Sequence, residues 1–464
     1  MTNFITNKKK LKELNQISSV YFAGIGGIGM SALARCFNER GVKVSGYDKT
    51  PTLLTDRLEA EGIRIHFTDD VLLLDKNADV VVYTPAIPAS HTELKYYRDN
   101  NYTLMKRSDI LGLLTKDSFN ICVAGTHGKT TTSAMIAHIL KDSGYGCNAF
   151  LGGIAANYDT NFWGSDNNVS VAEADEYDRS FLKLNPDVAI ITSMDADHLD
   201  IYGTEKNMQD AFIAFSGRIK PGGTLLIKDT VARMQEFKAP GKLSYAAFNK
   251  NADVHTEGLQ VINGSYLFDV VIGDARVKDM ILNMGGMHNI ENVTAAIAVA
   301  VLLKIDEAKI RSALASFAGV KRRFEYVVKN DRVVMIDDYA HHPEELRALI
   351  SGAKSLFPGK SCTVIFQPHL FSRTNDLAAG FAEVLSMADE VILLQIYPAR
   401  ELPMEGVSST MILDKMTIRK KSVMEQEALL DWVKNNDREL LITAGAGDID
   451  VLVQPIKEIL NSKN

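Results

Sequence analysis

The chain has 464 residues, of which 46% are hydrophobic and 23% are charged. This length accommodates several domains, and the composition is that of an ordinary globular protein. The formal net charge is -7 at pH 7, which argues against a general nucleic-acid-binding surface because such surfaces carry an excess of lysine and arginine. Small anions held in local pockets remain compatible with this charge.

The cysteines and the N-terminus indicate the compartment. The N-terminal sequence MTNFITNKKKLKEL has no apolar core of a signal peptide, and the longest apolar run, 295–303, is too short to span a bilayer. We therefore expect a cytoplasmic protein without stable membrane insertion. Four cysteines lie far apart without CxxC spacing, which predicts reduced thiols and no zinc site: Cys36, Cys122, Cys147 and Cys362.

Three blocks of alternating strands and helices follow one another along the chain. The first, 1–106, opens with a strand at 19–24, a glycine turn and a helix at 30–41, and further strands are predicted at 43–48 and 78–85. Strand–helix–strand repetition implies a parallel, doubly wound sheet.

The second block, 107–320, repeats this pattern and then changes. Its predicted strands lie at 119–125, 168–174 and 187–193, and its predicted helices at 131–144 and 289–304. Between them, 259–273 alternates apolar and polar residues around Asn263-Gly264, which indicates a β-hairpin.

The third block, 321–464, again has the pattern of a parallel sheet. Its predicted strands lie at 332–337, 362–367, 390–396 and 439–445. The fold class expected for the chain is therefore α/β with three domains, each built on a mainly parallel sheet. The first and third domains are expected to be Rossmann-like, and the central domain to be a P-loop ATPase domain.

The stretch AGTHGKTTT, at 124–132, is close to a Walker A loop. Only its first glycine is missing, since Val123 occupies that position. The stretch lies between a predicted strand and a predicted helix, so its backbone N–H groups and the helix N-terminus would favour phosphates. Lys129 would supply a positive charge to them, and the Thr130 hydroxyl suits Mg²⁺.

Two further side chains are expected near this loop. Glu173 ends one predicted strand, and His198 follows another. Ligands of open parallel sheets bind beyond the carboxyl ends of the strands. If both strands neighbour 119–125, Lys129, Glu173 and His198 meet at one edge and could hold Mg²⁺ beside a triphosphate.

The stretch GIGGIG, from Gly24 to Gly29, matches the dinucleotide fingerprint between a strand and a helix. Asp48, at the end of the next predicted strand, is a candidate for a ribose hydroxyl. The motif alone fits either NAD or a UDP-sugar. Two nucleotide sites in one chain exceed what a simple dehydrogenase or a simple ATPase needs.

Nine segments in order make the chain resemble the Mur ligase family over nearly its whole length. They are FAGIGGIGMSALA, AGTHGKTTT, EADEYDRSFL, DADHLDIYG, GGMHNIENVTAA, GVKRRFE, DDYAHHPEE, FQPHLFSRT and GAGDI. The phosphate loop of the family is similar to AGTxGKT[TS], so Val123 is no defect in it.

The resemblance implies an ATP-dependent amide-bond-forming ligase of cytoplasmic peptidoglycan precursor synthesis, and hence a role in cell shape and cell division. ATP would phosphorylate the lactyl carboxylate of UDP-N-acetylmuramate, and the amine of L-alanine would attack the acyl phosphate. Phosphate can leave an acyl carbon where oxide cannot, and phosphoryl transfer needs positioning and charge neutralisation above all. No nucleic-acid partner is expected, and the oligomeric state is expected to be a monomer or weak dimer.

The resemblance also assigns residues to each substrate. The catalytic set would be Lys129, Glu173 and His198. Among the metal ligands, Thr130 and Glu173 would bind one Mg²⁺, and His198 would bind a second. ATP would contact Gly125, Thr126, His127, Gly128, Lys129, Thr130, Thr131, His288, Asn289, Asn292, Arg323 and Asp338. The UDP-sugar would contact Gly26, Gly27, Ser31, Asp48 and Arg107. The amino acid would contact Tyr339, His341 and Arg373, since a guanidinium suits a carboxylate by bidentate geometry.

Two positions depart from the family pattern. Leu370 stands where the family often has arginine, and Ser193 where relatives usually have asparagine. The alternative functions are a murein-peptide recycling ligase of the same family, a nucleotide-dependent oxidoreductase that uses GIGGIG, and a non-catalytic nucleotide sensor. The pattern around DDYAHHP favours the addition of L-alanine, and an oxidoreductase leaves Lys129, Glu173 and His198 unexplained.

Overall fold

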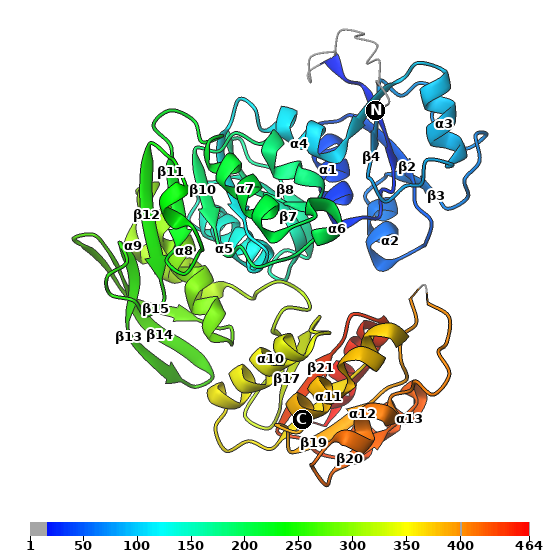
Figure 1. Ribbon diagram of the computed structural model, residues 1–464, viewed down its shortest axis with the longest axis vertical. Coiled ribbons are helices and arrows are strands. Elements are labelled where there is room, and N and C mark those ends of the chain that lie inside the picture. Colours follow the sequence, from blue (N-terminus) through cyan, green and yellow to red (C-terminus); the bar gives the residue numbers. More distant parts are fainter. Residues whose placement is uncertain (1–15, 400, 464) are drawn as a thin grey trace. The chain divides into compact units, whose positions relative to one another are not determined.

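The computed structural model describes residues 16–399 and 401–463, which form three β-sheets with intervening helices (Figure 1). The chain divides into two compact units. The first unit holds the described residues up to 154 together with 158–255 and 294–310. The second holds 155–157, 256–293 and the described residues from 311 onward.

The N-terminal sheet of the first unit has five parallel strands in the order β3-β2-β1-β4-β5. The strand order reverses at β1, since β2 and β3 lie on one side of it and β4 and β5 on the other. Doubly wound sheets bind ligands at such a reversal of strand order. Every residue of β1 is buried, as expected for a strand covered on both faces. The elements are β1 Ser19–Ala23, α1 Ile28–Glu39, β2 Lys43–Tyr47, α2 Leu53–Ala60, β3 Arg64–His66, β4 Val80–Tyr83, α3 Thr92–Asp99 and β5 Thr103–Lys106.

The central sheet of the first unit places β6 between β9 and β10, with parallel pairing on both sides. The adjacency assumed for the phosphate-loop strand is therefore confirmed. Its elements are α4 Arg107–Leu114, β6 Phe119–Ala124, α5 Lys129–Asp142, β7 Asn148–Ala155, β8 Thr160–Trp163, β9 Val169–Glu173, η2 Tyr177–Lys183, β10 Val188–Ile191, α6 Leu199–Tyr202, α7 Glu205–Ser216, β11 Thr224–Lys228, η3 Met234–Glu236 and β12 Gly241–Ala246.

A buried asparagine connects the N-terminal sheet to the central one. Asn161 in β8 donates to Ile28 O over 2.6 Å and to Ser31 Oγ over 2.9 Å, and it accepts a hydrogen bond from Arg35. All three partners belong to α1. Both β7 and β8 were absent from the sequence-based prediction.

The hairpin predicted around Asn263-Gly264 is present in the second unit. Both residues have positive φ, 50° and 72°, as a two-residue type I′ turn requires. It joins β13 Val254–Ile262 to β14 Ser265–Ile272, which pairs antiparallel with β15 Ala275–Leu282. Helices α8 Met287–Leu302 and α9 Glu307–Ser316 follow.

The C-terminal sheet has six strands in the order β16-β17-β21-β18-β19-β20. The pair β16–β17 is antiparallel and the remaining pairs are parallel, so the mainly parallel sheet is confirmed. The elements are β16 Glu325–Lys329, β17 Val334–Asp338, α10 Pro343–Leu356, β18 Cys362–Phe366, α11 Phe371–Leu385, β19 Glu390–Leu393, α12 Thr410–Lys415, β20 Lys421–Val423, α13 Gln426–Asn435, β21 Leu440–Ala444, η4 Asp448–Leu452 and α14 Val453–Ser462.

Two expectations about the whole chain can be compared with the structure. The four cysteines are free thiols, and all are buried. Among the described residues, no helix combines the length and the apolar character needed to cross a membrane.

Asp337 is a buried carboxylate near the end of β17. Its Oδ1 accepts a hydrogen bond from the Thr443 hydroxyl over 2.6 Å, whereas its Oδ2 has no hydrogen-bond partner and lies 3.5 Å from Arg322 Nε. Burial raises the pKa of Asp337 to about 7, although Arg322 and Thr443 oppose the shift. Burial likewise raises the pKa of the neighbouring Asp338 to about 6.

We expect Asp337→Asn to flatten the pH dependence of stability. An unfolded aspartate has a pKa of about 3.9, so between about pH 4 and pH 7 the folded chain binds more protons than the unfolded chain. Stability must therefore fall as the pH rises through this window. Melting temperatures at pH 5, 6, 7 and 8 should decline less in the variant, with a residual slope from Asp338. Asp331→Asn, at an exposed position, is the control, and an unchanged slope in Asp337→Asn would contradict the assignment.

Candidate functional site

The stretch 124–132 covers the end of β6, the connecting loop 125–128 and the start of α5, as predicted, and Lys129 is the first residue of the helix. Two residues after β10 hold this loop in place. The Thr192 hydroxyl donates to Ala124 O over 3.1 Å, and the His127 N–H donates to Ser193 Oγ over 2.8 Å. Ser193 also lies 2.9 Å from the Thr126 hydroxyl, so the serine at this unusual position supports the phosphate loop directly.

Glu173 lies beside the start of α5 because β9 pairs with β6. The register aligns Glu173 with Val123, and the Thr130 hydroxyl donates to both carboxylate oxygens of Glu173 over 2.9 and 3.1 Å. A glycine on the next strand makes room for this carboxylate, since a Cβ on Gly152 would lie 1.8 Å from Glu173 Oε2. Thr130 and Glu173, which were expected to bind one Mg²⁺ together, therefore lie in direct contact.

Lys129 contacts a residue that sequence reasoning missed. Its Nζ donates to Gly125 O and, over 2.8 Å, to Oε1 of Glu176. The Glu176 side chain is 1% exposed, and its Oε2 has no hydrogen-bond partner. Burial raises the pKa of Glu176, and the charge of Lys129 opposes that shift. The motif EADEYD offers a sequence signal for Glu176, because Glu176 is the second glutamate of the motif and closely follows Glu173.

His198 belongs to the same cluster through Glu176. Its Nε2 lies 4.0 Å from Glu176 Oε1 and 3.7 Å from Asp197 Oδ2. Glu176, Asp197 and His198 each offer a possible metal-ligand atom, and these atoms lie within 4.8 Å of one another. The Tyr177 ring meets the imidazole edge-on at 5.2 Å. The structure thus places His198 beside a second carboxylate as well as near the phosphate loop.

The glycine turn after β1 is closed by the ends of β2. Tyr47 O accepts hydrogen bonds from Gly24 N and Ile25 N over 2.8 and 3.0 Å. Asp48 Oδ2 accepts a hydrogen bond from Gly26 N over 2.7 Å. One carboxylate oxygen of Asp48, the candidate contact to a ribose, therefore stabilises the turn. Ser31 is fully buried, and its hydroxyl is hydrogen-bonded to Ile28 O within α1.

Arg107 joins the glycine turn to the loop after β9. Its guanidinium lies against Gly29, where an added Cβ would lie 2.6 Å from it. It also donates to Asp175 Oδ2 over 2.7 Å, and the adjacent Lys106 pairs with Asp178 over 2.6 Å. A small cavity is lined by Arg107, Glu173 and Asp175, among other residues. Arg107, a candidate UDP-sugar contact, and Glu173, a candidate metal ligand, therefore line the same cavity.

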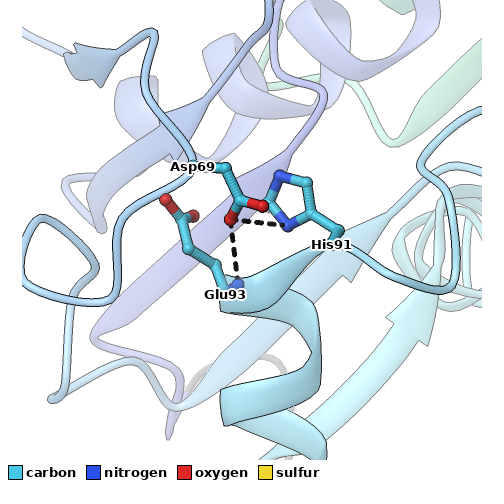
Figure 2. A group of neighbouring side chains, drawn as sticks. All are labelled: Asp69, His91 and Glu93. Atoms are coloured by element: carbon cyan, nitrogen blue, oxygen red, sulfur yellow. Dashed lines mark hydrogen bonds and ion pairs between the residues drawn. The ribbon is translucent and has the colours of Figure 1, made fainter.

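A second carboxylate–histidine group lies in the N-terminal sheet domain, formed by Asp69, His91 and Glu93 (Figure 2). Asp69 accepts backbone hydrogen bonds from Thr92 and Glu93 over 2.9 and 3.1 Å. Glu93 accepts from Asp70 N over 3.0 Å, from Tyr21 and from His66. Every carboxylate oxygen here already has a donor, so this group caps the start of α3.

In the second unit, the two asparagines predicted on the adenine side are buried at the start of α8. Asn292 Nδ2 donates to Asn289 Oδ1 over 3.0 Å, and Asn289 Nδ2 donates to Gly285 O over 2.6 Å. His288, next to them, is exposed. The three residues therefore lie together at the helix start, with His288 exposed and the two asparagines buried.

Arg323 and Asp338 lie close together through the backbone. Asp338 accepts hydrogen bonds from Phe324 N over 2.6 Å and from Ala340 N over 2.7 Å. Arg322 and Phe324, on either side of the exposed Arg323, have positive φ values of 60° and 49°. The carboxylate of Asp338 is therefore bound to the backbone segment that carries Arg323.

The three residues predicted for the amino acid are connected by a row of rings. The rings of Tyr339 and His341 meet edge-on with 5.3 Å between their centroids, and the ring centroids of His341 and His369 are 6.2 Å apart. Arg373 NH1 lies 3.3 Å from His369 Nδ1. Burial lowers the pKa of His369, and the charge of Arg373 lowers it further.

Leu370 precedes α11 and has φ 71°. Its N–H donates to Tyr397 O over 2.9 Å, which holds the start of the helix that carries Arg373. Leu370 occupies the position where the resemblance leads one to expect arginine, and Arg373 is the nearest cation along α11.

The chain matches family models in three consecutive segments. Residues 19–119 match "Mur ligase family, catalytic domain", 123–300 match "Mur ligase middle domain", and 322–451 match "Mur ligase, glutamate ligase domain". Together the models cover most of the chain.

Curated relatives and solved structures agree with these models. The chain is 49% identical to a UDP-N-acetylmuramate–L-alanine ligase of Flavobacterium johnsoniae, over 97% of the chain and 99% of the relative. It is 50% identical to the enzyme of that name from Parabacteroides distasonis, over 97% and 98%. The crystal structure of UDP-N-acetylmuramate–alanine ligase from Thermotoga maritima superposes with a TM-score of 0.82 at 28% identity, covering 96% of this chain and 100% of that one.

A murein peptide ligase from Psychrobacter arcticus, at 21% identity and TM-score 0.66, shares the fold. These matches confirm the predicted fold class and ligase class, and the chain belongs to the Mur ligase family.

Proposed function

We propose that this chain joins L-alanine to the lactyl carboxylate of UDP-N-acetylmuramate, with conversion of ATP to ADP and phosphate. The observation that carries the proposal is the full-length identity of 49–50% to relatives named for this reaction. The contacts of Lys129, Thr130 and Glu173 beside a phosphate loop support it, because an oxidoreductase has no use for them.

ATP activates the carboxylate by phosphorylation, and the amine of L-alanine then attacks the acyl carbon and displaces phosphate. The chain positions the reactants and neutralises charge. The backbone N–H groups of 125–131 and the ammonium of Lys129 bind the triphosphate. Asn289 and Asn292 bind on the adenine side, with His288, and Arg323 and Asp338 complete the nucleotide contacts.

Magnesium fits the residues of the first unit. The Thr130 hydroxyl and the carboxylate of Glu173 are the oxygen ligands that Mg²⁺ prefers, and His198 offers a nitrogen beside Glu176. The unpartnered, buried Oε2 of Glu176 is a further oxygen without a donor. When bound, Mg²⁺ would reduce the negative charge of the ATP phosphates, which the lactyl carboxylate of the substrate must approach.

We propose the remaining roles from the motifs that the chain shares with the family. Gly26, Gly27, Asp48 and Arg107 bind the UDP-sugar, with Ser31 acting through the packing of α1. Tyr339, His341 and Arg373 bind L-alanine. We further propose domain boundaries at 106/107 and 320/321, a monomeric or weakly dimeric state, and a cytoplasmic location.

The test of the function is phosphate release from ATP in the presence of UDP-N-acetylmuramate, with and without L-alanine. We expect release to require both substrates. Release that requires a murein peptide in place of L-alanine would favour the recycling ligase. Tight NADH binding that UDP-N-acetylmuramate fails to displace would favour the oxidoreductase.

We expect Lys129→Ala to abolish ligation and to leave UDP-N-acetylmuramate binding nearly intact. Loss of a preorganised charge at the transferring phosphoryl group should slow turnover roughly 10²–10³-fold, or about 3–4 kcal/mol. Coupled phosphate release and calorimetric titration measure the two effects. Lys206→Ala removes an exposed lysine of α7 and should change neither, whereas normal turnover of Lys129→Ala would exclude the assigned role.

We expect Arg373→Ala to raise the KM for L-alanine by roughly ten- to a hundredfold, because a charge-assisted hydrogen-bonded pair contributes about 1.5–3 kcal/mol. Arg373→Lys should recover part of the loss. The pKa of His369, followed by NMR, should rise toward its usual value in Arg373→Ala because a neighbouring positive charge is lost. Arg347→Ala, which removes an arginine paired with Glu383, is the control. An unchanged KM would refute the contact to the amino acid.

A further inference from the structure

Glu176 is a buried carboxylate whose charge is compensated by one cation. Its side chain is 1% exposed, and Lys129 Nζ lies 2.8 Å from its Oε1. Its Oε2 is buried and has no hydrogen-bond partner. A buried charge left without its partner is strongly destabilising, so the ionised form of Glu176 needs a cation beside it.

Lys129 is also the residue assigned to the nucleotide phosphates. In the described state its ammonium is engaged by Glu176 and by Gly125 O. A triphosphate in the loop would therefore compete with Glu176 for the same ammonium. If Lys129 turns toward the phosphates, Glu176 loses the partner that compensates its charge.

Two further potential ligands lie next to Glu176. His198 Nε2 is 4.0 Å from Glu176 Oε1, and Asp197 completes a group whose ligand atoms lie within 4.8 Å of one another. A divalent cation placed there would bind oxygen and imidazole ligands and would compensate the charge of Glu176.

We propose that Glu176 exchanges partners during nucleotide binding, from Lys129 in the nucleotide-free protein to the second divalent cation, which the family resemblance assigns to His198, once Lys129 engages the phosphates. This inference rests on the proposed ATP site. It makes metal-free nucleotide binding unfavourable, because binding would then leave the carboxylate uncompensated. Glu176 thereby ensures that nucleotide and cation bind together, and it does so without contacting the nucleotide.

The test measures the equilibrium affinity of a non-hydrolysable ATP analogue with EDTA and with excess Mg²⁺. Glu176→Gln keeps the shape of the side chain and removes its charge. We expect this variant to bind the metal-free analogue at least tenfold more tightly than the wild type, and to gain at least tenfold less affinity from Mg²⁺. Glu176→Asp retains the charge and should restore much of the Mg²⁺ dependence.

The control is Asp195→Asn, which removes a negative charge 3.9 Å from His127 of the same loop without touching Lys129. It should leave the ratio of the two affinities near the wild-type value, and an equal change in both variants would reduce the effect to general electrostatics and overturn the proposal. Weaker metal-free binding by Glu176→Gln would also overturn it, since Glu176 would then merely orient Lys129.

Manganese titration of the analogue complex by electron paramagnetic resonance provides a readout independent of activity. We expect Glu176→Gln to retain the Mn²⁺ associated with Thr130 and Glu173 and to lose affinity for a further Mn²⁺. Unchanged Mn²⁺ binding would exclude the cation as the second partner. A wild-type protein that fails to bind the analogue under any condition would instead contradict the proposed function.

Discussion

The position of β6 between β9 and β10 is the constraint on which the chemistry of the first unit depends. All three strands are parallel, so their carboxyl ends lie at one edge, and whatever follows them must meet the phosphate loop. Register matters as much as order, because a slip of one residue would turn every side chain of a strand to the opposite face. Glu173 reaches Thr130 because it is aligned with Val123.

Much of this arrangement could be predicted from the chain itself. Apolar runs such as 121–124 mark strands covered on both faces, and the two glycines and the lysine of AGTHGKTTT mark the loop. Glu173 was predicted correctly as a neighbour of Thr130, because a residue at the end of a parallel strand can only lie at that edge. The strands β7 and β8 escaped prediction because two adjacent glycines interrupt β7 and because β8 has only four residues.

The features that sequence reasoning missed depend on tertiary contacts. Glu176 follows β9 in a segment where Asp178 and Arg179 adopt positive φ values of 51° and 56°, and no periodicity signals that its carboxylate turns inward to Lys129. Ser193 was noted only as a departure, whereas its hydroxyl accepts the N–H of His127. Such roles become visible when distances across the sheet are known, since the partners lie far apart in the chain.

The buried cysteines have a consequence for following how the protein opens. Burial raises the pKa of Cys36 to about 11 and the pKa values of Cys122, Cys147 and Cys362 to about 12, so the reactive thiolate is scarce at neutral pH. Alkylation of each thiol must then await exposure by local or global unfolding. Because Cys36 lies in α1, Cys122 in β6 and Cys362 in β18, mass spectrometry of pulse-labelled peptides would time the opening of the three sheets separately, using native residues alone as reporters.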